Sequence, residues 1–260
     1  MTASSGSTPE YPMITVITVC FNSAATLGKT LQSVAEQSWP NVEHIVIDGG
    51  STDATKEVVA QYGAHLARFV SEPDRGIYDA MNKGIRVATG DVIGFLNADD
   101  VYAHQNVLAE VAGNMRCENL DALFGDVEFF RPENQTRTLR RYSSARFRPD
   151  RIAWGWMPAH PALFVRREVF QRVGGFRTDY RIAGDFEFVA RAFGKNSLRY
   201  RHLPEVLVRM LTGGISTAGW RNTLLLNREV LRACRENEIR TNILKILSKY
   251  PAKLLEYFHK

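Results

Sequence analysis

The chain has 260 residues and a mass of 29.4 kDa, with 45% apolar residues and a formal net charge of +5. This length is enough to bury the core of one large domain. The charge is uneven, because residues 216–260 hold nine Lys/Arg and four Glu whereas the first 215 residues are neutral. A protein that binds nucleic acid is typically basic throughout, and this chain is not, so nucleic acid is not expected as a partner.

The N-terminal residues 1–12 are rich in Ser, Thr and Pro and lack an apolar block, which predicts a loose tail rather than a signal peptide. The longest near-apolar run, Met13–Phe21, is far shorter than the ~20 residues that cross a bilayer. Three widely spaced cysteines, Cys20, Cys117 and Cys234, argue against a disulfide framework or a zinc knuckle. A soluble, cytoplasmic protein is expected.

The first hundred residues alternate between strand-like and helix-like segments, the pattern of a parallel sheet with crossover helices. Strands are predicted at residues 13–20, 43–48 and 92–96, and helices at 24–37, 53–61 and 77–88. The third helix carries an apolar stripe opposite the polar residues Asp79, Asn82, Lys83 and Arg86. The polar side either neutralises phosphate or is a solvated face with an Asp79–Lys83 ion pair.

The alternation fades after residue 100. Helices are predicted at residues 106–116 and 185–193, strands at 121–130, 138–142, 160–165 and 199–209, and helical structure from Trp220 onward. The expected organisation is an α/β domain over residues 13–215, with a nucleotide-binding half at 13–100 and an acceptor-binding half at 101–215. A basic, helical tail follows at 216–260.

Polar and acidic residues follow three of the predicted strands. They are Cys20-Phe21-Asn22, then Asp48-Gly49-Gly50-Ser51-Thr52-Asp53, and later Asn97-Ala98-Asp99-Asp100. Such ends share one edge of a doubly wound sheet, so we expect these residues to meet in one crevice. A structural turn would explain Asp48 and its glycines alone, but not three such ends. Neither GxGxxG nor GxxxxGK[ST] occurs, which disfavours dinucleotide oxidoreductases and P-loop phosphotransferases.

Four segments carry a resemblance to a known family: TVITVCFNSAATLGKTLQSVAEQSWPNVEHIVIDGGSTDAT, EPDRGIYDAMNKGIRVATGDVIGFLNADD, HPALFVRREVFQRVGGF and GDFEF. In this order the chain closely resembles the family 2 glycosyltransferases, over roughly residues 13–215. The resemblance implies the GT-A fold, an α/β architecture in which a Rossmann-like nucleotide half joins an acceptor half. Helices would flank a mostly parallel sheet, followed here by a C-terminal helical extension.

The resemblance also implies a nucleotide-sugar site and a divalent cation, Mn²⁺ or Mg²⁺. Asp99 and Asp100 match the acidic DXD-type motif, whose metal neutralises the departing diphosphate. Many relatives have Asp at the position of Asn97, which leaves the inner-sphere ligand open between the two acids; we favour Asp99. The implied nucleotide contacts are Cys20, Asn22, Asp48, Gly49, Ser51, Asp53, Asp74, Arg75, Tyr78, Asn82, Lys83, Asn97, Ala98 and Asp99.

Asp185 stands where relatives carry the catalytic base. Its apolar neighbours Phe186 and Phe188 would raise its pKa by desolvation, which suits a base near neutral pH. Glu187 is the competitor, and a helix N-cap role for Asp185 is the structural alternative. Low-ranked contacts to the donor sugar or acceptor are Trp156, His160, Arg181, Gly184, Glu187, Gly213 and Gly214. With Trp154 and Met157, Trp156 forms an aromatic loop that stacks on a sugar or packs in the core.

The resemblance implies an inverting glycosyltransferase that uses a UDP-sugar and a glycan or lipid-linked saccharide of the cell surface, as in O-antigen and lipopolysaccharide synthesis. In residues 242–258, apolar residues alternate with lysines, which indicates an interfacial helix on the inner face of an anionic membrane. Packing of this helix on the domain or on a second subunit of a homodimer is the alternative. The rival functions are a nucleotidyltransferase, which would need a Gly-rich basic loop, and a catalytically silent binding module, which would not need Asp185.

Overall fold

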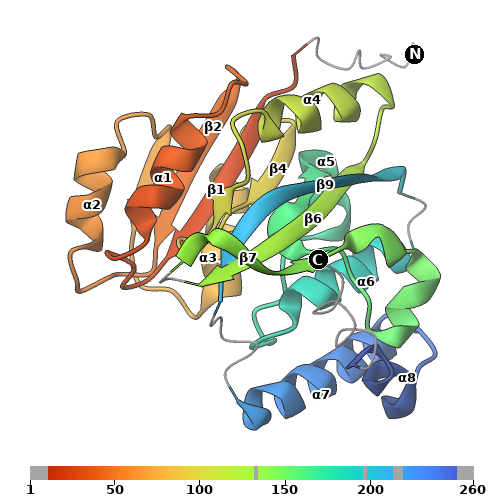
Figure 1. Ribbon diagram of the computed structural model, residues 1–260. Coiled ribbons are helices and arrows are strands. Elements are labelled where there is room, and N and C mark those ends of the chain that lie inside the picture. Colours follow the sequence, from red (N-terminus) through yellow and green to blue (C-terminus); the bar gives the residue numbers. More distant parts are fainter. Residues whose placement is uncertain (1–10, 132–133, 196–197, 213–218, 251–260) are drawn as a thin grey trace, which may run out of the picture.

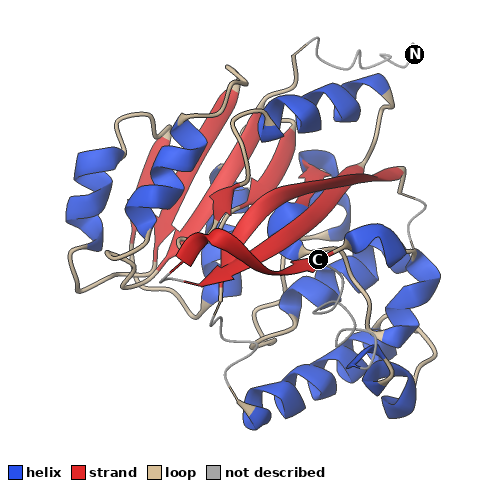
Figure 2. Ribbon diagram, in the orientation of Figure 1, coloured by secondary structure: helices blue, strands red, loops and turns tan. Residues whose placement is uncertain are grey.

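A computed structural model describes residues 11–131, 134–195, 198–212 and 219–250 of the chain. A single nine-stranded sheet runs through the molecule, and helices cover both of its faces (Figures 1 and 2). The strand order is β3-β2-β1-β4-β8-β6-β9-β5, and β7 pairs with β6 outside this path.

The first half is the predicted parallel α/β unit. Its strands are β1 (Ile14–Cys20), β2 (Val42–Asp48), β3 (Arg68–Ser71) and β4 (Val92–Phe95), and its helices are α1 (Leu27–Ala35), α2 (Thr55–Tyr62) and α3 (Ile77–Val87). All seven residues of β1 are buried, which explains its continuous apolar run. The edge strand β3 was not predicted, because most of its residues are exposed and the sequence lacks a strand-like apolar pattern there.

The second half is largely antiparallel. Its strands are β5 (Val101–Tyr102), β6 (Ala122–Arg131), β7 (Asn134–Tyr142), β8 (Leu163–Arg166) and β9 (Tyr200–Leu211). Strand β8 joins the halves, since it pairs antiparallel with both β4 and β6. The strand predicted at 160–165 starts late because His160–Ala162 form a 3-10 turn around Pro161.

Helices α4 (Val107–Cys117), α5 (Arg167–Val173) and α6 (Gly184–Gly194) pack this half. One core lies between the sheet and α3, α5 and α6, and it contains a run of aromatic rings that includes Phe95, Phe124 and Phe188. On the opposite face, α4 buries Leu108, Val111 and Met115 against the sheet. Helix α5 was not predicted.

Helices α7 (Trp220–Glu236) and α8 (Ile243–Leu247) form the C-terminal extension below the sheet in Figure 1. Helix α7 packs on α6, and α8 packs on α7. Of the amphipathic helix expected at 242–258, α8 is the part that falls within the described residues; residues 251–260 lie outside them. Among the helices that the structure describes, none has the length and apolar character required to span a bilayer.

Candidate active site

The three polar strand ends lie at one edge of the sheet, as the sequence predicts. Strand β1 pairs with β2 so that Cys20 stands beside Asp48, and with β4 so that Ile17 stands beside Phe95. The loops that follow these parallel strands therefore leave the sheet on the same side. This edge is where open α/β sheets bind ligands.

Asp48 organises the loop that follows β2. The side chain is fully buried, and its carboxylate accepts hydrogen bonds from the Ser51 amide, from the Ser51 hydroxyl and from the Ser71 hydroxyl at 2.6 Å. Burial alone would raise its pKa, but the donors of Ser51 and Ser71 together lower the pKa of Asp48. Protein groups use this carboxylate in the described structure, so Asp48 shapes the loop, and its predicted contact with the nucleotide stays a prediction.

Cys20 is also an internal residue. Its thiol lies 3.8 Å from Asp48 Oδ1 and is buried. Burial, followed by the nearby negative charge of Asp48, raises the pKa of Cys20 to about 12. The thiol therefore stays protonated and donates to Asp48, which makes it a support for the loop and not a nucleophile or metal ligand.

Asn22 and Asp53 connect the loops after β1 and β2 at the surface. Asn22 has a φ of 50°. Its side-chain Oδ1 accepts a hydrogen bond from the Thr52 backbone amide at 2.9 Å, and its backbone amide donates to Ser51 Oγ at 2.7 Å. Asp53 Oδ2 accepts the Ala24 amide at 3.1 Å. Both residues are exposed, so a nucleotide can reach this rim. Left-handed backbone at Asn22 suits the short polar side chain of asparagine.

Gly49 is required by the approach of the next loop. A Cβ at this position would stand 2.4 Å from Asp74 Oδ2. Asp74 in turn accepts the Gly76 amide at 2.8 Å, at the entrance to α3. The loops after β2 and β3 therefore pack directly on one another and form one wall of the site.

The carboxylates after β4 form an acidic pair with different environments. Asp100 is buried and accepts a hydrogen bond of 3.0 Å from Asn97 Nδ2, and both desolvation and the adjacent charge of Asp99 raise its pKa well above the ordinary value. Asp99 is partly accessible, and desolvation raises its pKa less. Two acids held together at this sheet edge are unfavourable unless a proton or a cation compensates them.

The chemistry of these side chains fits a divalent cation. Asn97 Oδ1 is buried and has no hydrogen-bond partner among the described residues. An unsatisfied amide oxygen beside two carboxylates offers the hard oxygen ligands that Mg²⁺ and Mn²⁺ prefer. Ala98 between them is buried, so its side chain has no direct access to a ligand.

Helix α3 uses several of its polar side chains within the protein. Lys83 Nζ lies 2.9 Å from Glu72 Oε1 and donates to the Pro73 carbonyl, whereas Asp79 pairs with Arg75. The proposed Asp79–Lys83 ion pair is therefore wrong. Asn82 exchanges two hydrogen bonds of 2.7 and 2.8 Å with the backbone of Phe176. This exchange gives Asn82 a structural role, and its predicted contact with the nucleotide stays a prediction.

Asp185 lies in the first turn of α6 and is half-buried. Desolvation raises its pKa, and the nearby His160, the Phe186 amide and the Tyr78 hydroxyl reduce this rise only in part. Tyr78 Oη lies 3.4 Å from Asp185 Oδ1 and donates to the Ile182 carbonyl at 2.7 Å. The helix N-cap is Ala183, so the N-cap role considered for Asp185 is wrong.

His160 links Asp185 to the end of β4. Its ring stacks on Phe95 at 5.3 Å and meets Phe176 edge-on at 5.6 Å. Both ring nitrogens are buried without a hydrogen-bond partner in the described structure, and burial lowers the pKa of His160. The neutral ring therefore offers one donor and one acceptor beside the carboxylate of Asp185.

Gly184 allows the contact between α3 and α6. A Cβ at Gly184 would stand 2.7 Å from the Tyr78 ring, so a larger residue would displace the tyrosine. Tyr78 is itself buried. This packing places Tyr78 beside the candidate base, and its predicted contact with the nucleotide stays a prediction.

A group that the sequence analysis missed holds the segment before Asp185. Glu229 of α7 is buried, and its carboxylate accepts the successive amides of Arg181, Ile182 and Ala183 at 2.8, 2.9 and 2.8 Å. These amides lie directly before the first turn of α6, where backbone N–H groups have no partner within the helix. A glutamate next to Val230, on the buried side of an amphipathic helix, was the available signal.

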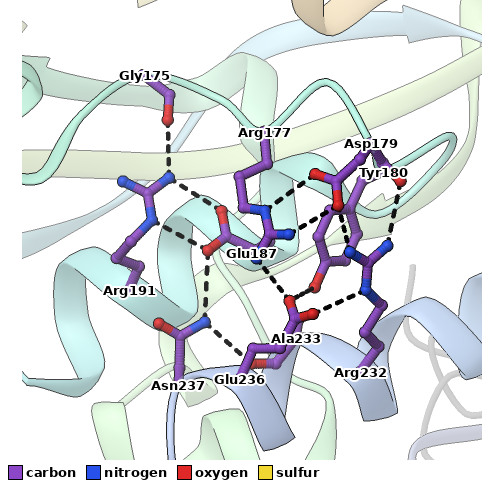
Figure 3. A network of polar contacts seen from close by, with 10 residues as sticks. All are labelled: Gly175, Arg177, Asp179, Tyr180, Glu187, Arg191, Arg232, Ala233, Glu236 and Asn237. Carbon is purple, nitrogen blue, oxygen red and sulfur yellow. Dashed lines mark hydrogen bonds and ion pairs between the residues drawn. The ribbon is translucent and has the colours of Figure 1, made fainter.

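Glu187 is engaged within the protein, and its predicted contact with the donor sugar or acceptor stays a prediction. The side chain is buried and forms a bidentate pair with Arg191 at 2.9 and 3.0 Å, and Asn237 of α7 also contacts it. Figure 3 shows this pair beside the Arg177–Asp179–Arg232–Glu236 network, both of which join α6 and its preceding loop to α7. Glu187 is turned to the helix interface because it lies two residues after Asp185 on α6.

The remaining predicted contacts are Arg181, the aromatic loop that contains Trp156, and the glycines after β9. Arg181 is exposed and lines a cavity of about 380 Å³ together with Arg75, Tyr78 and Tyr180. Trp154 of the aromatic loop lies under Lys245 of α8, at 5.5 Å from its ring centre to Nζ, and Met157 packs on the core. Gly213 and Gly214 lie outside the described residues. Trp156 is half-buried.

The fold is that of GT-A enzymes. S. aureus TarS 1-349 in complex with UDP-GlcNAc matches 94% of this chain with a TM-score of 0.68 and 17% identity, and 72% of that chain is covered. Mannosyltransferase PcManGT from Pyrobaculum calidifontis, in complex with GDP-Man and Mn²⁺, matches with a TM-score of 0.65 and 21% identity. The match covers 96% of this chain and 72% of the PcManGT chain. Of a longer TarS chain, this protein spans 43%.

The sequence comparisons identify the family. Residues 15–174 match the model of Glycosyl transferase family 2. A PGL/p-HBAD biosynthesis glycosyltransferase of Mycobacterium bovis is 35% identical over 198 residues, which are 74% of this chain and 75% of the relative. The chain therefore belongs to glycosyltransferase family 2 and is a nucleotide-sugar-dependent glycosyltransferase. This result confirms the predicted family, fold and enzyme class, and it rejects the nucleotidyltransferase and the silent binding module.

Proposed function

We propose that the protein transfers a sugar from a UDP-linked donor to a hydroxyl of a lipid-linked or cell-surface glycan, with inversion at the anomeric carbon. The acceptor oxygen bonds to that carbon as its bond to the diphosphate oxygen breaks. Asp185 receives the hydroxyl proton, and the nucleoside diphosphate leaves. The observation that carries this proposal is a carboxylate with a raised pKa, beside Tyr78 and His160, near the sheet edge where β1 and β4 end.

In this proposal the exposed rim of Asn22 and Asp53 binds the nucleotide, while Asp48 and Ser51 hold that rim in shape. Asp99 and Asp100 would hold Mn²⁺ or Mg²⁺, and Asp99 would be the inner-sphere ligand because it is the more accessible of the two. When bound, the ion supplies Lewis-acid neutralisation of the diphosphate. The Mn²⁺ named with GDP-Man in PcManGT supports this assignment.

The choice of UDP rests on the TarS structures, whose titles name UDP and UDP-GlcNAc, whereas the PcManGT title names GDP-Man. Nucleotide release from panels of UDP- and GDP-sugars, each with Mn²⁺ or with EDTA, tests the proposal. We expect release from a UDP-sugar with Mn²⁺, and its loss with EDTA or with Asp185→Asn. Release from GDP-sugars alone would overturn the donor assignment, and undiminished turnover by Asp185→Asn would overturn the assigned base.

Thermal stabilisation by the same nucleotide panel separates binding from chemistry. A ligand at a hundred times its dissociation constant stabilises the folded state by about 2.7 kcal/mol. We expect UDP with Mn²⁺ to stabilise both the native chain and the Asp185→Asn variant. Matched stabilisation with lost turnover would place Asp185 in the chemical step, whereas lost stabilisation would place it in donor binding.

A further inference from the structure

The outer face of α7 and α8 exposes large apolar side chains. Trp220 is 72% exposed, Leu224 53% and Leu244 75%, and Ile243 and Leu247 are exposed beside them. On α7, the residues Trp220, Leu224, half-buried Leu231 and Arg235 follow one another at intervals of four, seven and four, so they share one side of the helix. Exposed apolar groups gathered in this way mark an interaction surface.

The same face is basic. The side chains of Arg221, Arg228, Arg235 and Arg240 are exposed, and Lys245 is partly exposed. The acidic residues of the two helices and their connection are turned inward or paired: Glu229 is buried against the segment before α6, Glu236 pairs with Arg177 and Arg232, and Glu238 pairs with Lys195. The outward charge within residues 219–250 is therefore positive.

Apolar and cationic groups also meet in a hollow between the last turns of α7 and the connection that leads to α8. A cavity of about 270 Å³ is lined by Leu231 and Ile239, by Arg235 and Arg240, and by Thr241 and Glu238. The carboxylate of Glu238 is paired with Lys195, which leaves the two arginines as the unneutralised charges of the lining. An arginine binds phosphate through a planar fork of N–H donors, and its stem covers apolar surface. This combination suits a phosphate head group attached to a hydrocarbon chain better than it suits a polar macromolecule.

We propose that the α7–α8 face, defined by Trp220, Leu224, Leu231, Arg235, Arg240 and Leu244, docks on the surface of an anionic membrane. The apolar side chains enter the interface between head groups and acyl chains, and the arginines contact lipid phosphates. Both contributions are needed, because a purely apolar face would bind neutral lipid equally and a purely basic face would not enter the bilayer.

Docking on this face would bring the active site to the membrane. The inner side of α7 carries Glu229, which holds residues 181–183 directly before Asp185. The width of one helix, about 10 Å, therefore separates the docking face from the segment that precedes the proposed base. In Figure 1, α7 lies on the side of the sheet toward which β1 runs at its carboxyl end. Delivery of a lipid-linked acceptor by this route rests on the proposed function, but docking itself does not.

Flotation of the full chain with lipid vesicles tests the docking. We expect it to float with vesicles of equal parts phosphatidylcholine and phosphatidylglycerol, at least ten times more than with phosphatidylcholine alone, and less at high salt. The double variant Trp220→Ser with Leu244→Ser should lose at least tenfold in binding, as should Arg235→Ser with Arg240→Ser. The matched control, Tyr62→Ser with Arg68→Ser at the α2–β3 edge, should float like the native chain.

Other occupants of the face give different results. If Leu254→Ser with Leu255→Ser abolishes flotation and the two α7–α8 variants do not, the segment after residue 250 binds the lipid and the proposal is overturned. If the native chain does not float, and light scattering shows a dimer that Trp220→Ser with Leu244→Ser dissociates, the partner is a second copy. Nucleotide release with a soluble acceptor, unchanged in the docking variants, shows that a lost flotation does not reflect a damaged donor site.

Discussion

Glu229 accepts a hydrogen bond of 2.8 Å from the Ala183 amide, across 46 positions of the chain. With the amides of Arg181 and Ile182, it thereby fixes three consecutive residues just before the helix that carries Asp185. Hydrogen bonds to a charged acceptor are stronger than those between neutral groups, and the burial of Glu229 keeps them from exchanging with water. The C-terminal extension is therefore part of the active-site support.

The Glu229→Gln variant should lower kcat about tenfold. A glutamine keeps the shape of the side chain but offers one oxygen, so its NH₂ group would face at least one of the three amides. The loss of a hydrogen bond to a charged group costs about 1.5–3 kcal/mol, and 1.4 kcal/mol in the barrier is a factor of ten. Steady-state kinetics with saturating donor measure the effect, and KM for the donor should change less than kcat.

Glu236→Gln is the matched control for this variant, since Glu236 lies on the same helix but bonds the exposed Arg177 and Arg232. Exposed pairs of this kind are worth about 0–1 kcal/mol. Equal kcat values for the two variants, per folded enzyme, would show that Glu229 stabilises α7 without positioning Asp185.

The Asp185→Asn variant should lose about 10²–10⁴ in kcat and should be at least as stable as the native chain at pH 7. Burial raises the pKa of Asp185 in the folded protein, so the folded state holds a proton that the unfolded chain has already released. Its contribution to stability is thus complete below the unfolded pKa, about 4, and is lost as the pH rises through the folded pKa. Thermal unfolding from pH 4 to 7 should show the advantage of the variant growing with pH.

The same group governs the acid limb of activity. Transfer needs the ionised carboxylate, so kcat/KM of the native enzyme should fall as the pH decreases through a pKa above that of an ordinary aspartate. His160→Phe keeps the ring between Phe95 and Phe176 but removes its nitrogens. A His160 ring that gains a proton as the pH falls opposes the rise in the pKa of Asp185, so this limb should move to higher pH in the variant, which lacks that charge. An unmoved limb would mean that another group is the base.

The Glu187→Gln variant should lower the free energy of unfolding by about 3 kcal/mol, because removal of one partner leaves buried charge on Arg191 poorly compensated. The kcat of the folded fraction should stay within about threefold of native, since this small change corresponds to less than 1 kcal/mol in the barrier. Denaturant unfolding gives the first quantity and active-site titration with kinetics the second. A stable variant with a large loss of kcat would restore Glu187 as a catalytic candidate.

Strands β1, β2 and β4 of the parallel half were predicted because they are mostly buried, whereas the exposed edge strand β3 was not. The continuous apolar run of β1 and its polar end at Cys20 are local signals, and so are the acids after β4. The partner of Glu187, Arg191, lies four residues later on the same helix and is a local signal, whereas the partner of Asn82, the Phe176 backbone, depends on how distant elements pack. The support by Glu229 joins α7 to the segment before α6, and no local pattern encodes that pairing.

Asp99 and Asp100 should differ in their response to metal. Asp99→Asn removes the accessible carboxylate, so half-maximal activity should require at least ten times more Mn²⁺, while the thermal stability without metal should stay the same or rise because a desolvated charge is lost. Asp100→Asn replaces one of the two carboxylate oxygens with an NH₂ group, which cannot accept the buried hydrogen bond from Asn97 Nδ2. The metal-free thermal stability should therefore change more than in Asp99→Asn. Activity against Mn²⁺ concentration, with thermal unfolding in EDTA, measures both. If Asp100→Asn shifts the Mn²⁺ requirement and Asp99→Asn does not, the inner-sphere ligand is Asp100.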